Sequence, residues 1–142
     1  MTTVTAFEVV GGLDAIGSSI NSSRDLIVAV RRGFPVQTVE YIISSGRMSL
    51  AEIDLLVIPR KTLSHRRKIG TLTSEQSDRL IRAARVIAEA EETFGSQEKA
   101  GKWLRRPTVA LAGEKPLDLL DTSEGADQVE ALLGRISHGI AA

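Results

Sequence analysis

The sequence predicts an all-α fold, with no sheet beyond a possible short strand near the N-terminus. Aromatic residues are scarce, at 4% of 142 residues, so the core must be built from Leu, Ile, Val and Ala, which favours helices over a β-sandwich. Apolar residues recur at helical spacing in successive segments from residue 24 to residue 138. Two segments begin with a capping box, Ser49 with Glu52 and Thr73 with Gln76, which is a signature of helix N-termini.

The first 23 residues carry the weakest pattern in the chain. The run from Val4 to Val10 is compatible with a short strand or an extended arm. The glycines that follow do not have the spacing of a dinucleotide-binding or phosphate-binding loop. We therefore interpret residues 1–23 as a flexible lead-in.

Helical segments make up most of the remaining chain, each bounded by proline, glycine or a capping residue. We predict helices over residues 24–32, 35–45, 49–58, 59–67, 74–94, 96–106 and 122–138, and a short turn over 116–120. The helix over 74–94 is the longest, so we expect it to be the spine of the fold.

The two short helices over 49–58 and 59–67 have the arrangement of a helix-turn-helix. Pro59 separates them, because proline disfavours helical conformation in the residue before it and suits the first turn of a new helix. Leu63 is the one long apolar residue that can anchor the second helix to a core. Many helix-turn-helix sequences have Ala near position 53 and Gly near 57, so Ile53 and Val57 predict a bulkier turn here.

The second of these helices is polar and basic, as a helix that lies in the major groove of DNA must be. Its predicted DNA-binding residues are Arg60, Lys61, Thr62, Ser64, His65, Arg66, Arg67 and Lys68. Arginine and lysine suit guanine O6 and N7 and phosphates, and the hydroxyls of threonine and serine suit phosphate oxygens. The alternative is that these residues form a solvated basic face between two core helices.

Charge is distributed unevenly along the chain, although the formal net charge is zero. Residues 24–85 hold twelve basic and six acidic residues, whereas residues 110–142 hold two basic and six acidic residues. A basic middle and an acidic C-terminal part indicate two surfaces with two different partners.

Patterns typical of enzymes and metal sites are missing from the sequence. Without cysteine there is no thiolate ligand or cysteine nucleophile, and this composition fits a reducing cytoplasm. The histidines, His65 and His138, belong to no HExxH motif, and no serine lies in GxSxG. Glu114, Asp118 and Asp121 are close in sequence, but acids in a polar loop are usually solvated. No apolar run has transmembrane length, and the first residues lack the basic start of a signal peptide. We predict a cytoplasmic protein that is not an enzyme and uses no metal or cofactor.

Several motifs in the second half of the chain occur in combination. They are Trp103-Leu104, Pro107, Pro-Leu-x-Leu-Leu at 116–120, Thr122, Glu124-Gly125, and Leu133-Gly-Arg-Ile with Gly139. Together they make residues 70–139 resemble the C-terminal domain of Xre/MbcA/ParS-type antitoxins, which are bacterial partners of RES-domain toxins. The upstream GFPVQTVEYI and IPRKTLSHRRK resemble the helix-turn-helix of the same family.

The resemblance implies an all-helical antitoxin that forms a homodimer and represses its own operon by binding operator DNA. It also implies a RES-domain toxin as partner, one that consumes NAD or uses it in ADP-ribosyl transfer. On this basis we divide the chain into a lead-in (1–23), a helix-turn-helix DNA-binding lobe (24–70) and a helical dimerisation and toxin-binding lobe (71–142). The long helix over 74–94 offers the largest apolar stripe for dimerisation, although the same stripe must also serve the core.

The end of the last helix is where we expect contact with the toxin. The residues concerned are Arg135, Ile136, Ser137, His138 and Gly139. Ile136 continues the apolar stripe from Val129 and should face the protein's own core. Arg135, Ser137 and His138 fall largely on the other face, where arginine offers fixed donors for a carboxylate. An arginine in a last helical turn can instead simply complement the helix dipole.

Two other interpretations remain open. One is a stand-alone dimeric transcription regulator whose acidic lobe only dimerises. The other is a protein-binding adaptor whose helix-turn-helix no longer contacts DNA. A neighbouring gene for a protein of RES-toxin type would favour the antitoxin over both.

Overall fold

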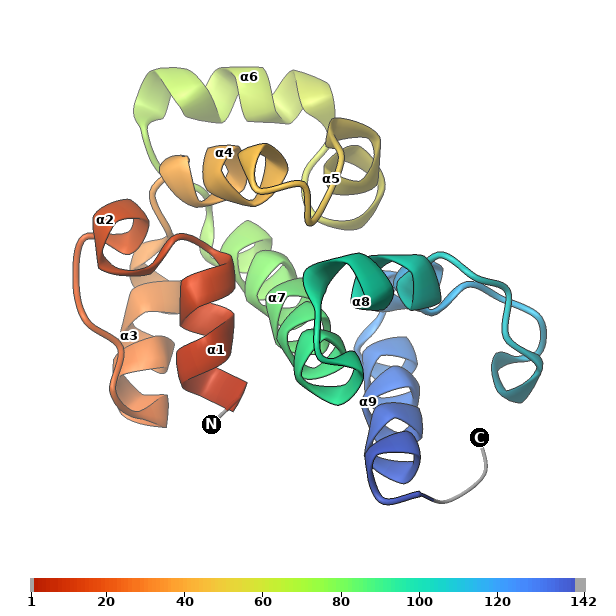
Figure 1. Cartoon of the computed structure of the whole chain (residues 1–142). Helices are drawn as coiled ribbons and strands as arrows, with labels where there is room; N and C mark the ends of the chain where they lie inside the picture. The colour runs from red at the N-terminus through yellow and green to blue at the C-terminus, as the bar shows by residue number, and fades with distance from the viewer. Residues whose placement is uncertain (1, 140–142) are drawn as a thin grey trace.

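The computed structural model describes residues 2–139, with side chains from residue 6 onward, and this part of the chain is helical with no strand (Figure 1). The α-helices are α1 (Thr2–Val9), α2 (Gly12–Ile16), α3 (Ser23–Arg32), α4 (Gln37–Ser44), α5 (Leu50–Leu56), α6 (Arg60–Ile69), α7 (Ser74–Phe94), α8 (Gln97–Leu104) and α9 (Ser123–Ser137). Two short 3-10 helices, η1 (Val109–Leu111) and η2 (Pro116–Asp121), lie between α8 and α9. The predicted all-α fold is confirmed.

The long helix α7 runs through the middle of the molecule, and α1, α3, α8 and α9 pack around it (Figure 1). Its predicted capping box is present: Gln76 N–H donates to Thr73 Oγ1, and Thr73 N–H donates to the Gln76 side chain. The buried residues of α7 lie on several of its sides: Gln76, Ser77, Leu80, Ile81, Ala83, Ala84, Val86, Ile87, Ala88 and Ala90. The chain's own helices cover these residues, so the stripe that we expected to be shared between dimerisation and the core lies in the internal core.

The N-terminal segment corrects the prediction of a strand or an extended arm over residues 4–10. Residues 2–9 form α1, which packs along α7, and α2 packs against α4. Ala6, Val9 and Val10 are buried in the same core as the α7 side chains. The β-branched residues of this run favour strands on their own, but packing against α7 overrides that preference. The segment is therefore a structural part of the molecule and not a lead-in.

The helix-turn-helix consists of α5 and α6, joined by residues 57–59. The predicted capping box at the start of α5 is present, with Ser49 and Glu52 exchanging hydrogen bonds. Val57 and Ile58 are both buried, so the bulk of this turn lies inside the core. The residues that follow α6 are hydrogen-bonded to the segment before α4. Val36 N–H donates to the carbonyl of Gly70, and Leu72 N–H donates to that of Phe34.

The segment from α8 to α9 packs against α7, and Arg82 of α7 donates to the carbonyl of Leu120 and to Ser123 Oγ. Trp103 is buried and lies against Phe94, with their ring centroids 5.3 Å apart. Thr122 caps α9 by accepting the N–H of Gly125 at 2.9 Å. A Cβ at position 125 would lie 2.0 Å from the carbonyl oxygen of Leu119. Only glycine therefore fits where η2 meets the first turn of α9.

Candidate nucleic-acid and partner-binding surfaces

The outer face of α6 carries a stripe of polar and basic side chains (Figure 1 shows α6 at the edge of the molecule). Lys61, Ser64, His65 and Lys68 are exposed, and their spacing of three and four residues places them on one face of the helix. Leu63 points the opposite way and is fully buried. This arrangement leaves the stripe free to enter a concave partner surface such as the major groove of a duplex.

The remaining residues of the predicted DNA-binding set have different environments. Arg60 is exposed, while its backbone N–H donates to the Asp54 carboxylate at 2.7 Å, so that Asp54 caps α6 from the preceding helix. Thr62 is half-buried beside the stripe. Arg66 is also half-buried, and its Nε donates to the carbonyl oxygen of Thr71 at 2.7 Å. Arg66 thus joins α6 to the segment that leads into α7.

Arg67 already has an acidic partner within the chain. Its Nε donates to Oε1 of Glu40 on α4 at 2.8 Å, and the two side chains are 45% and 50% exposed. An ion pair this exposed contributes little to stability, about 0–1 kcal/mol. It does place a carboxylate of α4 directly beside the Arg67 guanidinium.

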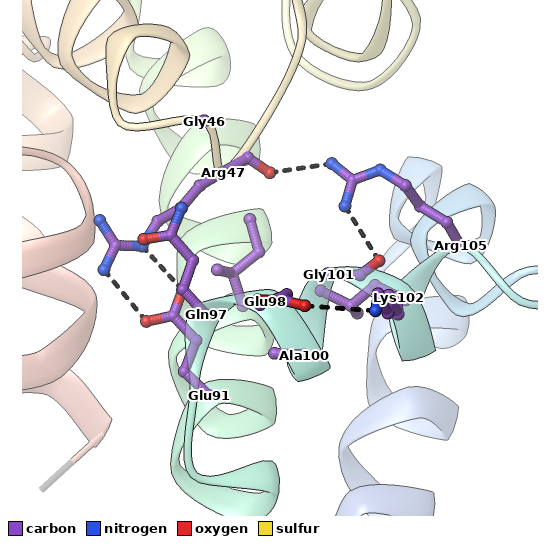
Figure 2. Close-up of a pocket in the computed structure, with 11 residues that line it drawn as sticks. Gly46, Arg47, Glu91, Gln97, Glu98, Ala100, Gly101, Lys102 and Arg105 are labelled. Carbon is purple, nitrogen blue, oxygen red and sulfur yellow. Dashed lines mark hydrogen bonds and ion pairs between the residues drawn. The ribbon is translucent and has the colours of Figure 1, made fainter.

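A second polar cluster connects the α4–α5 turn to α7 and α8. We call it the clamp, and its side chains are those of Arg47, Glu52, Glu91, Gln97 and Arg105. Figure 2 shows Arg47 paired with Glu91, with Nε–Oε2 and guanidinium–Oε1 distances of 2.7 and 3.0 Å. The hydrogen bond to Glu91 raises the pKa of Arg47 above its ordinary value, against the opposing effect of burial. Gln97 adds a bond from Nε2 to the carbonyl oxygen of Ser45 at 2.7 Å. A pocket of about 620 Å³ lies beside these groups.

The other half of the clamp joins α8 to the first helix of the helix-turn-helix. Arg105 donates to both carboxylate oxygens of Glu52, at 2.9 and 2.8 Å, and to the carbonyl of Arg47 at 3.1 Å. Burial alone would raise the pKa of Glu52, but hydrogen bonds from Arg105 and Ser49 outweigh it, and the pKa is lowered. Glu52 thus belongs both to the capping box of α5 and to an ion pair with α8.

The predicted contact segment at the end of α9 is arranged much as the helical pattern indicated. Ile136 packs against the core, and Arg135 is exposed. The side chains of Ser137 and His138 turn back onto their own helix: Ser137 Oγ donates to the carbonyl oxygen of Gly134 at 3.3 Å, and His138 Nδ1 lies 2.6 Å from the same atom. Arg135 is therefore better placed than these two to meet a partner.

Carboxylates of α7 and α9 lie close together at the surface where these two helices meet. Burial raises the pKa of Glu89, and the nearby carboxylates of Glu130 and Glu92 raise it further. Burial also raises the pKa of Glu130, as does Asp127, whereas Arg85 lowers it. Acids on two helices thus repel one another at this surface.

Between residues 2 and 139, no three His, Asp or Glu side chains lie together in a way that could hold a metal ion. Within the same range, no helix has both the length and the apolar character needed to cross a membrane.

A basic stripe on a helix-turn-helix, together with an acidic C-terminal part of the chain, is typical of a DNA-binding protein that also binds another protein. Residues 25–85 match the model for an antitoxin Xre-like helix-turn-helix domain. Residues 89–139 match the model for the antitoxin Xre/MbcA/ParS C-terminal toxin-binding domain. The chain belongs to the Xre/MbcA/ParS family of antitoxins.

Named relatives agree with this assignment. Antitoxin Xre of Pseudomonas putida is 34% identical over 119 residues, which make up 83% of this chain and 74% of that protein. Antitoxin Xre of Yersinia enterocolitica is 34% identical over 128 residues, or 88% of this chain and 86% of that protein. A Prs ADP-ribosylating antitoxin of Sphingobium sp. is 35% identical over 77 residues, 48% of each chain. The chain is thus an antitoxin of a toxin-antitoxin system, with a helix-turn-helix domain.

Proposed function

We propose that this antitoxin neutralises a RES-domain toxin by direct binding and represses its own operon through the helix-turn-helix. The toxin would consume NAD or use it in ADP-ribosyl transfer. The observation that carries the proposal is the separation of two surfaces: the basic stripe lies on α6, and the matched toxin-binding domain comprises residues 89–139. One chain can therefore hold operator DNA and a toxin at different places.

The DNA-binding part is tested by the salt dependence of affinity for the operon's promoter fragment. Lys61 and Lys68 are exposed on the stripe, and each phosphate contact contributes about −0.9 to the slope of log affinity against log salt. The double variant Lys61→Ala/Lys68→Ala should lower the magnitude of that slope by about one unit per lysine.

The matched control removes two exposed lysines elsewhere, Lys99 on α8 and Lys115 before η2. The variant Lys99→Ala/Lys115→Ala should retain the slope of the unmodified protein. Equal slopes in both double variants would reject α6 as the DNA-binding helix.

The toxin-binding part is tested by growth of cells that co-express the RES-domain protein encoded by the neighbouring gene. Deletion from Arg135 onward would also remove Ile136, which packs against the core, so point variants are sharper. Arg135→Ala should reduce protection at equal antitoxin abundance, whereas Gln128→Ala, an exposed change earlier on α9, should not. If the neighbouring protein does not bind the antitoxin in a pull-down, the proposed partner is wrong.

We also propose that the antitoxin is a homodimer, since two reading helices related by a two-fold axis suit a palindromic operator. The buried residues of α7 pack within the chain, so dimerisation must use other surfaces. Light scattering should give twice the mass of one chain. A monomer at high micromolar concentration, without DNA or toxin, would contradict this.

A further inference from the structure

Val109 differs from every other large apolar side chain in the matched toxin-binding domain. It is 95% exposed, and it is the one exposed large hydrophobic residue between residues 89 and 139, all of which the structure describes. The aromatic residues of this domain, Phe94 and Trp103, pack against each other and the core. A single exposed valine is ordinary by itself, so its setting decides whether it has a role.

The loop that presents Val109 is held by its own hydrogen bonds. Thr108 N–H donates to the carbonyl of Glu114 at 3.1 Å, and Gly113 N–H donates to that of Thr108 at 2.9 Å. Leu111 is buried at the base of the loop, where η1 packs against α9. Residues 108–114, which we call the loop, are therefore held in a defined conformation by their own hydrogen bonds.

The loop also maintains an unfavourable backbone conformation. Ala112 has φ of 56°, the left-handed region, and it is the one non-glycine residue with positive φ in the described part of the chain. This conformation costs an L-residue about 1–2 kcal/mol. Such backbone conformations are concentrated at binding and switching sites, where the surrounding structure holds them in place. Here the result is that Val109 and Ala110 point into solvent from an ordered base.

We propose that the loop is the apolar anchor of this antitoxin, and that Val109 inserts into an apolar pocket on the toxin. The inference rests on the proposed function and names the contact surface for it. The occupant is the toxin because residues 89–139 match the family's toxin-binding domain and Val109 is the exposed apolar group that this domain offers. A preformed loop also loses little conformational freedom on binding, which favours insertion.

A second copy of the chain is a weaker candidate for the occupant. A stable dimer buries about 800 Å² on each partner, and one valine with an adjacent alanine supplies only a small part of that area. Insertion into a concave site on a different protein needs no such large matching surface on the loop. Self-association through the loop is therefore an outcome that the experiment must detect, not the one we expect.

The test is a competition between full-length antitoxins for a limiting amount of tagged RES-domain toxin from the neighbouring gene. Val109→Ala should bind about tenfold more weakly, the factor expected when two methyl groups lose a buried environment. Val109→Asp should bind more than about a hundredfold more weakly, because insertion would bury an unpaired carboxylate. Since Val109 is exposed, both variants should keep the melting temperature and promoter affinity of the unmodified protein.

The control is Leu55 on α5, which is 67% exposed and lies outside the matched toxin-binding domain. Leu55→Ala and Leu55→Asp should compete for the toxin as well as the unmodified chain does. Toxin binding by Val109→Asp at full strength would overturn the inference while leaving the proposed function intact. A Val109→Asp variant that becomes monomeric but still binds toxin would overturn it in favour of self-association. If the unmodified antitoxin fails to capture the toxin, both proposals fail together.

Discussion

At the scale of single residues, the DNA contact proposed for Arg67 would compete with its ion pair to Glu40. A phosphate that approaches Arg67 must replace the Glu40 carboxylate, which lies 2.8 Å from Nε, and must also face its negative charge. Both effects apply to any duplex, whatever its sequence. Under the proposed function, Glu40 would therefore weaken general phosphate binding and leave more of the discrimination to base contacts from the stripe.

We predict that Glu40→Gln raises the affinity for a duplex of arbitrary sequence several-fold at low salt. The salt slope should become steeper by about 0.9, because one more phosphate is neutralised when Arg67 is released. Fluorescence anisotropy over a range of salt concentrations measures both quantities. The matched control is Glu98→Gln, which breaks the exposed Glu98–Lys102 pair of 3.2 Å on α8 and should change neither. Identical behaviour of the two variants would refute the role assigned to Glu40.

Sequence patterns predicted which helix carries the basic residues, but not which group each basic side chain contacts. The apolar anchor Leu63 was enough to orient α6, since it is the one long apolar residue in the run 59–67. The partner of Arg67 lies 27 residues earlier, and that of Arg66 is a backbone carbonyl. No local spacing encodes such partners, because they depend on how α4 and the α6–α7 connection pack. The DNA-binding role of these residues therefore remains a prediction, and the structure shows only the surroundings of each side chain.

At the scale of helices and turns, the clamp fixes α5 relative to α8. The two bonds between Arg105 and Glu52 form a fork-to-fork contact, which is geometrically specific as well as strong. Glu52 also closes the capping box, so the same side chain stabilises the start of α5 and pairs with Arg105. Arg105 thereby joins the end of α8 to the helix that precedes α6.

A double-mutant cycle should reveal this coupling. Glu52→Gln and Arg105→Ala are each expected to destabilise the protein, and the pair together should cost less than their sum, with an interaction energy of about 1 kcal/mol. Urea unfolding of the four proteins measures it. The coupling should fade in acid: the lowered pKa of Glu52 means that its contribution is present above the unfolded pKa, near 4.3, and lost as pH falls through the folded value. An additive cycle at pH 7 would show that the fork is not formed in solution.

The helices with explicit end signals were predicted well, whereas α1 and α2 in residues 1–23 were not predicted. Capping boxes marked α5 and α7 because their hydrogen bonds are local, within three residues. By contrast, α1 has no capping signal in the sequence and is rich in β-branched residues. Its helical state depends on contact with α7, which is more than sixty residues away in sequence, so no pattern within residues 1–23 could reveal it.

At the scale of the whole molecule, the N-terminal helices should be needed for stability. Val9 is buried between α1 and the rest of the core, whereas Leu13 on α2 is exposed. We predict that Val9→Ala lowers the free energy of unfolding by about 1–3 kcal/mol, through loss of two buried methyl groups and the cavity they leave. Leu13→Ala should stay within about 0.5 kcal/mol of the unmodified protein. Equal stability of both variants would restore the interpretation of this segment as a lead-in.

Repulsion at the α7–α9 surface should make the fold less stable as pH rises. Glu130 has a raised pKa, so the folded state binds more protons than the unfolded state between the two pKa values, and stability falls as pH rises through that window. Glu130→Gln should therefore stabilise the protein at pH 7, by about a few tenths of a kcal/mol for a half-exposed charge. The gain should vanish near pH 4, where the unfolded carboxyl is itself protonated. Chemical denaturation at the two pH values measures the difference, and a destabilising effect at pH 7 would contradict it.

The continuity of α7 constrains how such antitoxins can exchange parts during evolution or engineering. The matched helix-turn-helix domain ends at residue 85 and the matched toxin-binding domain begins at residue 89, so the boundary falls inside an unbroken helix. Each residue inserted there would rotate one half against the other by about 100° and shift it by about 1.5 Å. A chimaera that joins the DNA specificity of one antitoxin to the toxin specificity of another must therefore be spliced in helical register. Compatible crossovers are those that keep the length of this helix unchanged.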